Sequence, residues 1–472
     1  MPAQCTQTTI EFQGLPGRKV VGSFTGGRIT SDAGALLLRE VERATGIIKR
    51  FADCFSDARD PARIEHSVYE LVAQRVYGLC MGYEDLIDHD RLRRDPLFAA
   101  LVGKEDVMGA ERKQARDRGC ALAGKSTLNR LEQTPLEASA RYHKIGYDAE
   151  AIDRVFVELF LRSHNRPPNE IVLDLDATDD PLYGDQEGRF FHGFYGHYCY
   201  LPLYIFCGKH LLCARLRRSN IDAAAGALEE VQRIVGQIRS RWPKTEIILR
   251  ADSGFARDDL MAWCEEQEGV EYLFGLAKNS RLKQRIAKPL ERARRKSLVG
   301  HRAVRSFQNL RYRTRESWSR KRRVVAKIEH LPKGSNPRFV VTSLAGPRID
   351  ARRLYEKLYC ARGDMENRIK EQQLDLFSDR TSTATMHGNQ LRLYLSSLAY
   401  VLTNELRRVG LSFTKLASPY VSTIRNTLFK IGALVEVTAR RVLIRFSSGY
   451  PYADLFHRVV RAIQTHYQPL RC

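Results

Sequence analysis

The sequence has no cysteine pair in C-x-x-C spacing and no apolar run long enough to cross a membrane. Its ten cysteines are scattered through 472 residues, which argues against a zinc site and predicts reduced thiols rather than a disulfide framework. The longest apolar stretch, around 198–207, has only the length of a strand. The first residues, MPAQCTQTT, lack the basic-then-apolar pattern of a secretory signal. We therefore expect a cytoplasmic protein without a membrane partner.

Acidic residues are scarce beside basic ones. The chain has 55 Asp and Glu against 77 Lys and Arg, a net charge of +22. Its 43% hydrophobic and 28% charged residues are those of an ordinary globular protein, and the length allows two or three domains. A positive surplus of this size favours a polyanionic partner. Because a membrane is not expected, nucleic acid is the leading partner.

Residues 1–165 are predicted to be a mainly helical DNA-binding region with a short β arm over 8–30. Within it, residues 119–126 read GCALAGKS and match the phosphate-loop pattern G-x4-G-K-S. That motif requires a buried strand directly upstream, whereas residues 111–118 are mostly charged. Two other interpretations stay open, an ordinary exposed helix from Ser126 or a helix-turn-helix that presents Asn129 and Arg130 to a DNA groove.

From residue 166 the apolar pattern changes from helices to strands. Apolar runs at 171–173, 197–207, 211–216, 246–249 and 272–276 predict strands, and 222–239 and 258–266 predict helices. Paired strands followed by strand–helix alternation predict an α/β fold, with a mixed sheet and helices on both faces. Residues 166–277 are its first part.

Acidic residues stand where two of these strands end. Asp174 and Asp176 follow the first strand on the same face, and Asp252 follows the strand at 246–249. Adjacent strands would bring these ends together, and Mg²⁺ or Mn²⁺ prefers carboxylate oxygen. The alternative for Asp252 is a simple helix-entry turn.

Residues 278–349 are predicted to be a basic, all-β insertion. Its first part, 278–327, contains 19 Lys and Arg and only two acids, with aromatic residues interleaved. Concentrated charge with aromatics suits contact with phosphates and stacking on bases. The alternative is a solvated basic face whose aromatics form a local core. The candidate DNA-binding residues are Trp318, Arg320, Lys321, Arg322 and Arg323.

Helical spacing returns from Asp350, and residues 350–410 are predicted to complete the α/β core. Tyr359, Arg362 and Glu366 lie at i, i+3 and i+7, so they would share one side of a helix. Residues 411–472 are expected to form a separate region with a hairpin over 434–446 and a last helix. That region is a candidate for dimerisation.

Three motifs in this order resemble those of a known family. They are D-A-T at 176–178, R-A-D-S-G at 250–254 and Y-x2-R-x3-E at 359–366. The chain is similar in them to the DDE transposases of bacterial insertion sequences, particularly the cut-and-paste group with a Y-(2)-R-(3)-E-(6)-K signature. The resemblance covers at least 169–410. It implies a ribonuclease-H-like mixed sheet interrupted by the insertion before Glu366.

The resemblance also implies a reaction. Asp176, Asp252 and Glu366 would be the catalytic residues and would bind two Mg²⁺ ions (or Mn²⁺) that act on the scissile phosphate. Cleavage at the terminal inverted repeats of double-stranded DNA and strand transfer into target DNA would follow. A homodimer on paired DNA ends is expected by analogy.

The phosphates of the element's end would be held by Tyr359 and Arg362. The family's lysine falls at Gln373 in this chain, and Lys370, one turn earlier, is the nearest substitute. Gln373 slightly favours a protein that is catalytically impaired. Three alternative functions stay open. They are a catalytically impaired DNA-binding regulator, a ribonuclease-H-type nuclease without strand transfer, and a phosphate-loop ATPase.

Overall fold

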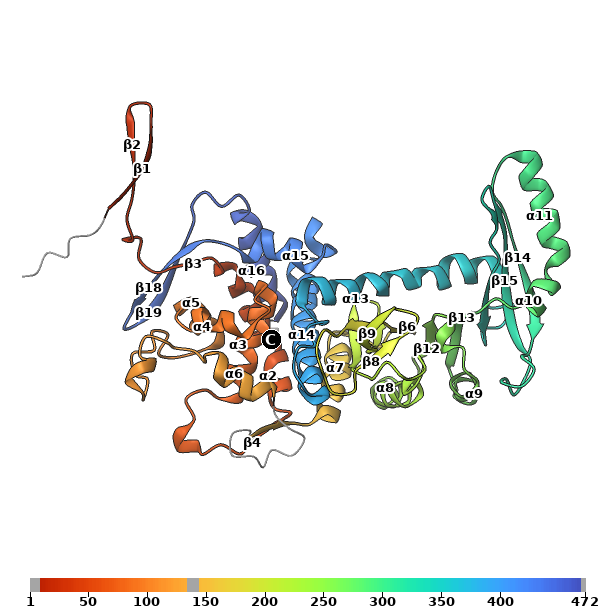
Figure 1. The fold of residues 1–472 in the computed structure, drawn as a ribbon, viewed down its shortest axis with the longest axis horizontal. Helices are drawn as coiled ribbons and strands as arrows, with labels where there is room; N and C mark the ends of the chain where they lie inside the picture. Colours follow the sequence, from red (N-terminus) through yellow and green to blue (C-terminus); the bar gives the residue numbers. More distant parts are fainter. Residues whose placement is uncertain (1–8, 134–143, 468–472) are drawn as a thin grey trace, which may run out of the picture. The chain divides into compact units, whose positions relative to one another are not determined.

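The computed structural model describes residues 9–133 and 144–467 and divides the chain into two compact units (Figure 1). Unit 1 comprises the residues up to Lys49, Arg59–Leu131 and the residues from Glu405. Unit 2 comprises Arg50–Ala58 and Glu132–Asn404. No described helix is long and apolar enough to span a bilayer.

Unit 1 is mainly helical, as the sequence predicts for its N-terminal part. The predicted β arm forms a hairpin of β1 (Ile10–Leu15) and β2 (Arg18–Gly22), although Thr8 lies outside the described residues. The α-helices of unit 1, with α2 crossing its boundary, are α1 (Leu36–Thr45), α2 (Ile47–Ala52), α3 (Val68–Met81), α4 (His89–Leu92), α5 (Pro96–Val102), α6 (Lys125–Glu132), α15 (Val421–Ile424) and α16 (Ala453–Tyr467).

The C-terminal residues pack with the N-terminal helices and do not form the separate region that the sequence predicts. Strand β18 (Ala433–Thr438) pairs with β19 (Arg441–Phe446) on one side and with β3 (Ile29–Thr30) on the other. Lys430 forms a 2.6 Å ion pair with the buried Asp32. These partners lie about 400 positions apart, and local sequence patterns contain no signal for such distant pairings.

The segment 119–126 is not a phosphate loop. In the part of the chain that the structure describes, a 3₁₀ turn (Ala115–Asp117) precedes it, and no strand leads directly into it. Helix α6 starts at Lys125, and its preceding turn is fixed by Gln74 of α3, whose amide bonds both the N–H and the C=O of Ala123. The phosphate-loop ATPase interpretation is therefore wrong.

Unit 2 is built on a nine-stranded mixed sheet, which confirms the predicted α/β class. Its strand order is β11-β10-β6-β12-β13-β17-β15-β14, with β16 paired to β15. Strand β12 runs parallel to β6 and β13, whereas β10 runs antiparallel to β6. The strands are β6 (Glu170–Ala177), β10 (Leu203–Cys207), β11 (His210–Arg215), β12 (Glu246–Ala251), β13 (Val270–Leu276), β14 (Val304–Tyr312), β15 (Arg322–Leu331), β16 (Gly334–Ser335) and β17 (Arg338–Thr342).

Alternation along β6 and β12 divides their side chains between two cores. Leu173 and Leu249 pack on one face, against α7 (Ala149–Arg162), α8 (Ala227–Arg241) and α9 (Asp258–Glu266). Ile248 packs on the opposite face, against Leu354 and Tyr355 of the late helical segment. Figure 1 shows these helices on the two sides of the sheet. The period of two therefore puts Asp174, Asp176 and Arg250 on the second face.

The late helical segment is not one regular helix. It passes from α12 (Ala351–Arg353) through a π-helical turn (Leu354–Tyr359) and a 3₁₀ turn (Cys360–Arg362) into α13 (Gly363–Leu376). The predicted single helix is therefore corrected at the residues of the Y-R-E motif. π-helical turns occur frequently at functional sites, where they re-aim side chains.

The predicted all-β insertion is wrong in two respects. Residues 278–349 contain two helices, α10 (Ser280–Arg285) and α11 (Ala287–Gly300), and their strands β14, β15 and β17 extend the main sheet. Leu282, Ile286 and Ala293 recur at helical spacing among the basic residues and are buried against these strands. Because basic residues surround these three apolar positions, the helical spacing was not recognised in the sequence. Figure 1 shows α10 and α11 beside β14 and β15.

The other described elements of unit 2 are short, apart from one long helix. They are β4 (Phe55–Asp57), β5 (Ile145–Tyr147), β7 (Asp180–Pro181), β8 (Phe190–His192), β9 (His197–Tyr200) and α14 (Met386–Leu406), which crosses into unit 1. The predicted strand over 197–207 is thus two strands, and β9 belongs to a separate three-stranded sheet, β7-β9-β8.

Trp318, predicted to contact DNA, is a core residue. Its side chain is 3% exposed and packs edge-on against Tyr312, with ring centroids 5.8 Å apart. The guanidinium of Arg322 lies over its ring at 5.6 Å. The alternative of a local aromatic core is therefore the one that the structure supports.

Replacing Trp318 should test stability rather than DNA binding. We expect Trp318→Ala to lower the free energy of unfolding by about 3–5 kcal/mol, because a large buried ring leaves a cavity. Denaturant unfolding would measure this, with the exposed Leu298→Ala on α11 as control. A Trp318→Ala protein of unchanged stability and weaker DNA binding would contradict the core assignment.

Candidate active site

Asp174 and Asp176 share a face of β6 but have different partners. Asp174 is buried and accepts two hydrogen bonds from Arg250, Nε to Oδ1 at 2.5 Å and Nη2 to Oδ2 at 2.7 Å. Arg250 stands directly opposite Asp174 in the parallel register of β6 and β12, and it also donates to the carbonyl of Leu358. Such a fork-to-carboxylate pair occupies both oxygens of Asp174. This favours Asp176 over Asp174 as a ligand.

Asp176 lies where other charges converge. Its Oδ2 accepts a hydrogen bond from Arg362 Nη1 at 3.1 Å, and its Oδ1 accepts one from the Ala177 N–H. Burial raises the pKa of Asp176 to about 6, Arg362 opposes that rise, and the charges of Asp252 and Glu366 add to it. The repulsion means that Asp252 and Glu366 both lie within electrostatic reach of Asp176.

Asp252 and Glu366 reach this place from separate elements. Strands β6 and β12 are paired up to Leu175 and Ala251, so Asp252 leaves β12 level with Asp176. Its carboxylate also accepts the Gly254 N–H at 2.8 Å, which makes it the cap of a helix-entry turn as well. Glu366, on the first turn of α13, accepts from Arg362 Nη2 at 2.6 Å.

Arg362 therefore bridges two of the three carboxylates. Among residues 9–133 and 144–467, no group of three or more His, Cys, Asp or Glu side chains is close enough to hold a metal ion as it stands. Arg362 instead supplies positive charge to Asp176 and Glu366. Mg²⁺ and Mn²⁺ prefer carboxylate oxygens as ligands, and these carboxylates need a positive counter-charge. The residues present fit a divalent ion chemically.

Tyr359 borders a basic cavity beside Asp252. Its hydroxyl lies against Gly275, where an added Cβ would come within 2.6 Å of the oxygen. The cavity, of about 500 Å³, is also lined by Lys278 and Arg338. Arg338 was not identified from the sequence, because nothing local distinguishes it from other surface arginines.

Gln373 is bonded to the residues that follow β6. Its amide donates to the carbonyl of Asp179 and to Oδ1 of Asp180, at 3.1 Å each. Asp180 is fully buried, and burial raises the pKa of its carboxyl well above the ordinary range. Lys370, the nearest substitute for the family's lysine, is exposed on α13.

Two of the predicted phosphate-binding arginines are structural. Arg322 is 3% exposed and ion-paired with Asp258 at 2.5 Å and Glu265 at 2.7 Å. Arg323 is also buried and donates to the carbonyls of residues 344 and 349. As consecutive residues of β15 they point to opposite faces of the sheet, and each is buried on its own face. Arg320 and Lys321, just before that strand, are exposed.

An aromatic hairpin beside the carboxylates was missed. The segment 190–198, FFHGFYGHY, includes β8 and the first two residues of β9, and the side chain of Phe194 in it is 85% exposed. Burial raises the pKa of Tyr195 to about 12, and the charges of Asp179, Asp176 and Asp252 add to the rise. Exposed aromatic rings are surfaces on which unpaired bases can stack. The density of aromatics between glycines was the available signal.

The family model described as transposase DDE domain, group 1, matches residues 12–468. The chain belongs to this DDE transposase family. A search of curated proteins finds no match for this transposase. Among solved structures, it is similar to a piggyBac transposase in a synaptic complex with hairpin DNA, with 11% identity and a TM-score of 0.41. That likeness covers 94% of this chain and 84% of the other.

The charged carboxylate of Asp176 should destabilise the folded transposase at neutral pH. Because the pKa of Asp176 in the folded state is raised from 3.8 to about 6, its stabilising contribution is full below pH 3.8 and is lost as the pH rises through about 6. Asp176→Asn should therefore raise the free energy of unfolding at pH 7.5 by roughly 3 kcal/mol without metal. Unfolding curves with a chelator would measure this, with Asp364→Asn as control. A gain that persists below pH 4 would contradict it.

Arg362 should compete with divalent metal. Removing its charge with Arg362→Gln leaves Asp176 and Glu366 without a counter-ion, so Mn²⁺ should bind roughly tenfold more tightly in the absence of DNA, a change of about 1.4 kcal/mol. Titration calorimetry would measure the affinity. Arg368→Gln, which alters a neighbouring arginine of α13, is the matched control. Unchanged or weaker Mn²⁺ binding in Arg362→Gln would exclude this competition.

Proposed function

We propose that this chain is the transposase of an insertion sequence, which cleaves DNA at the element's terminal inverted repeats and transfers the freed strands into target DNA. The observation that most supports this is the convergence of Asp176, Asp252 and Glu366 around Arg362 at one edge of the sheet. These acids come from three separate elements, and the family to which the chain belongs is defined by such a triad.

A divalent metal is part of this proposal, since DDE transposases generally use one. Asp176, Asp252 and Glu366 would hold it, as two ions of Mg²⁺ or Mn²⁺. When bound, such a pair activates a water or 3′-hydroxyl for attack on the phosphate and neutralises charge on the leaving oxygen.

The chain's own residues would position the DNA. The planar fork of Arg362 suits two hydrogen bonds to phosphate oxygens once it leaves the carboxylates. Tyr359, with a hydroxyl beside the basic cavity, would donate to a neighbouring phosphate. Lys370, Arg320 and Lys321 are exposed cations that would add backbone contacts.

The remaining parts of the proposal concern the setting of the reaction. We propose a ribonuclease-H-like core, because the strand pattern with acids at two parallel strand ends supports it. We further propose that a homodimer joins two DNA ends, and that the protein acts in the bacterial cytoplasm.

A cleavage assay on supercoiled DNA with the native element ends and Mg²⁺ tests the triad. Asp176→Asn and Glu366→Gln should each lower the cleavage rate by roughly 10³-fold, because each removes one member of a unit that acts together. The control is Asp364→Asn, an exposed acid of α13 two positions before Glu366. Circular dichroism would verify that all three variants fold.

The outcomes separate the alternatives. Equal cleavage by all three variants would reject the assigned triad. Binding of the ends without cleavage by the wild type would support a regulator. Cleavage without joined products would support a nuclease.

A further inference from the structure

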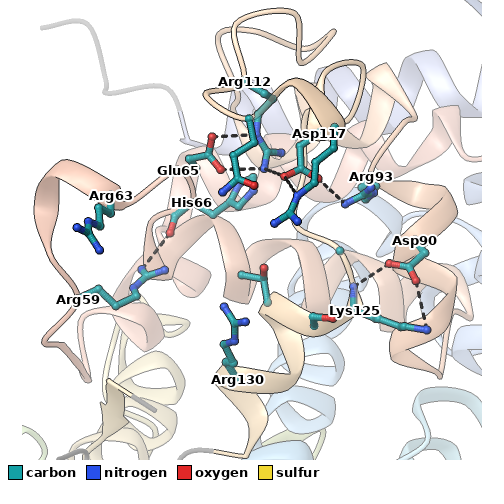
Figure 2. A pocket seen from close by; sticks show the side chains of 15 residues that line it. Arg59, Arg63, Glu65, His66, Asp90, Arg93, Arg112, Asp117, Lys125 and Arg130 are labelled. Carbon is teal, nitrogen blue, oxygen red and sulfur yellow. Dashed lines mark hydrogen bonds and ion pairs between the residues drawn. The ribbon is translucent and has the colours of Figure 1, made fainter. Parts of the chain in front are cut away.

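A basic cavity lies in unit 1, apart from the residues assigned to catalysis. Its volume is about 570 Å³, and it lies between the first turn of α6, residues 59–66, and residues 112–117. Seven Lys or Arg residues line it against three Asp or Glu residues. Figure 2 shows Arg130 of α6 pointing toward the cavity, with His66 and Arg112 across from it. The excess of positive charge predicts an anionic ligand.

The three acids of the wall do not cancel this excess. Glu65 pairs with Arg112 at 3.0 Å, and Asp117 lies 3.5 Å from Arg93. Asp90 pairs with Lys125. Asp117 also lies 3.9 Å from Arg112 and from Arg116, and Arg63 lies 3.4 Å from Asp60, outside the lining. Within the lining, seven cations still face three acids.

His66 gives independent evidence of a missing partner. Its side chain is 5% exposed and lines the cavity, yet neither ring nitrogen has a hydrogen-bond partner in the structure. Burial and the nearby Lys104 and Arg112 lower its pKa to about 3, so the ring is neutral and has one donor and one acceptor. Buried polar groups are nearly always bonded, and an oxygen-rich anion would satisfy the donor.

The first turn of α6 adds polar groups in a fixed position. Ser126 and Thr127 line the cavity with their hydroxyl groups at the positive end of the helix dipole. Gln74, itself buried, fixes the preceding turn through both backbone groups of Ala123. The N–H of Lys125 is bonded to Asp90 at 3.0 Å. This start of α6 is therefore preorganised before any ligand binds.

The lining favours a nucleic-acid backbone over a free nucleotide. Among the described residues that line the cavity, none is aliphatic, and His66, which is buried, is the only aromatic one. Sites for small molecules are mostly apolar, and a nucleotide base would find nothing to stack on here. Phosphate oxygens of DNA require only cations, hydroxyls and helix starts.

We propose that this cavity binds a backbone phosphate of the element's DNA, with α6 as the contacting helix. The proposal rests on the proposed function and adds a DNA contact outside the carboxylate site. It makes the start of α6 an element that positions the DNA backbone.

The test compares Arg116→Ala, Arg130→Ala and their double variant with Arg43→Ala, an exposed cation of α1 outside the cavity. Fluorescence anisotropy would measure affinity for element-end DNA over a salt series. Each cavity variant should bind roughly tenfold more weakly. Its slope of log affinity against log salt should fall by about 0.9 for each DNA phosphate that the variant no longer neutralises. Arg43→Ala should match the wild type, and thermal melts would verify folding.

Three other outcomes separate the cavity proposal from the proposed function and from nucleotide binding. Folded cavity variants with wild-type affinity and salt slope would overturn the cavity, while loss of cleavage in Asp176→Asn would still support the proposed function. ATP that binds the wild type and displaces DNA, but does neither in Arg130→Ala, would overturn the DNA assignment in favour of a nucleotide. A wild type that binds no DNA would overturn both proposals.

Discussion

The buried pair of Asp174 and Arg250 is the interaction on which the site depends. It joins the parallel strands β6 and β12 at matched positions and adds a hydrogen bond to the backbone of the helical segment at Leu358. Breaking a buried ion pair costs several kcal/mol, because one charge is left unpaired. The pair therefore fixes the strand ends and the helix that bring Asp176, Asp252 and Glu366 together.

The same face also concentrates like charges, which opposes folding. Asp176 has a raised pKa because it is buried near two other carboxylates, and the charge of Arg362 and the hydrogen bond from the Ala177 N–H offset this rise in part. Such a site is held in place by the surrounding core. Here that core is the packing of Ile248 against Leu354 on the same face of the sheet. Sites that function through perturbed acids commonly reduce stability in this way.

Much of unit 2 could be predicted because its signals are local. The strand at Glu170–Ala177, the helix at Asp258–Glu266 and the mixed sheet all follow from apolar period and order. The basic segment was mispredicted because charge is a poor guide to burial. Leu282 and Ile286 lie among lysines and arginines, and Arg322 is buried since two acids of α9 neutralise it. Partners distant in sequence decide such cases.

The sequence by itself determined the class of sheet, the order of the motifs and the acids at its strand ends, because spacing and alternation act over a few residues. Only the tertiary structure decided which acid of β6 is committed to Arg250, and that Arg362 bridges Asp176 and Glu366. It also decided that Trp318 belongs to the core and that a basic cavity forms around the start of α6. These outcomes depend on side chains brought together from distant positions, and no local pattern encodes such contacts.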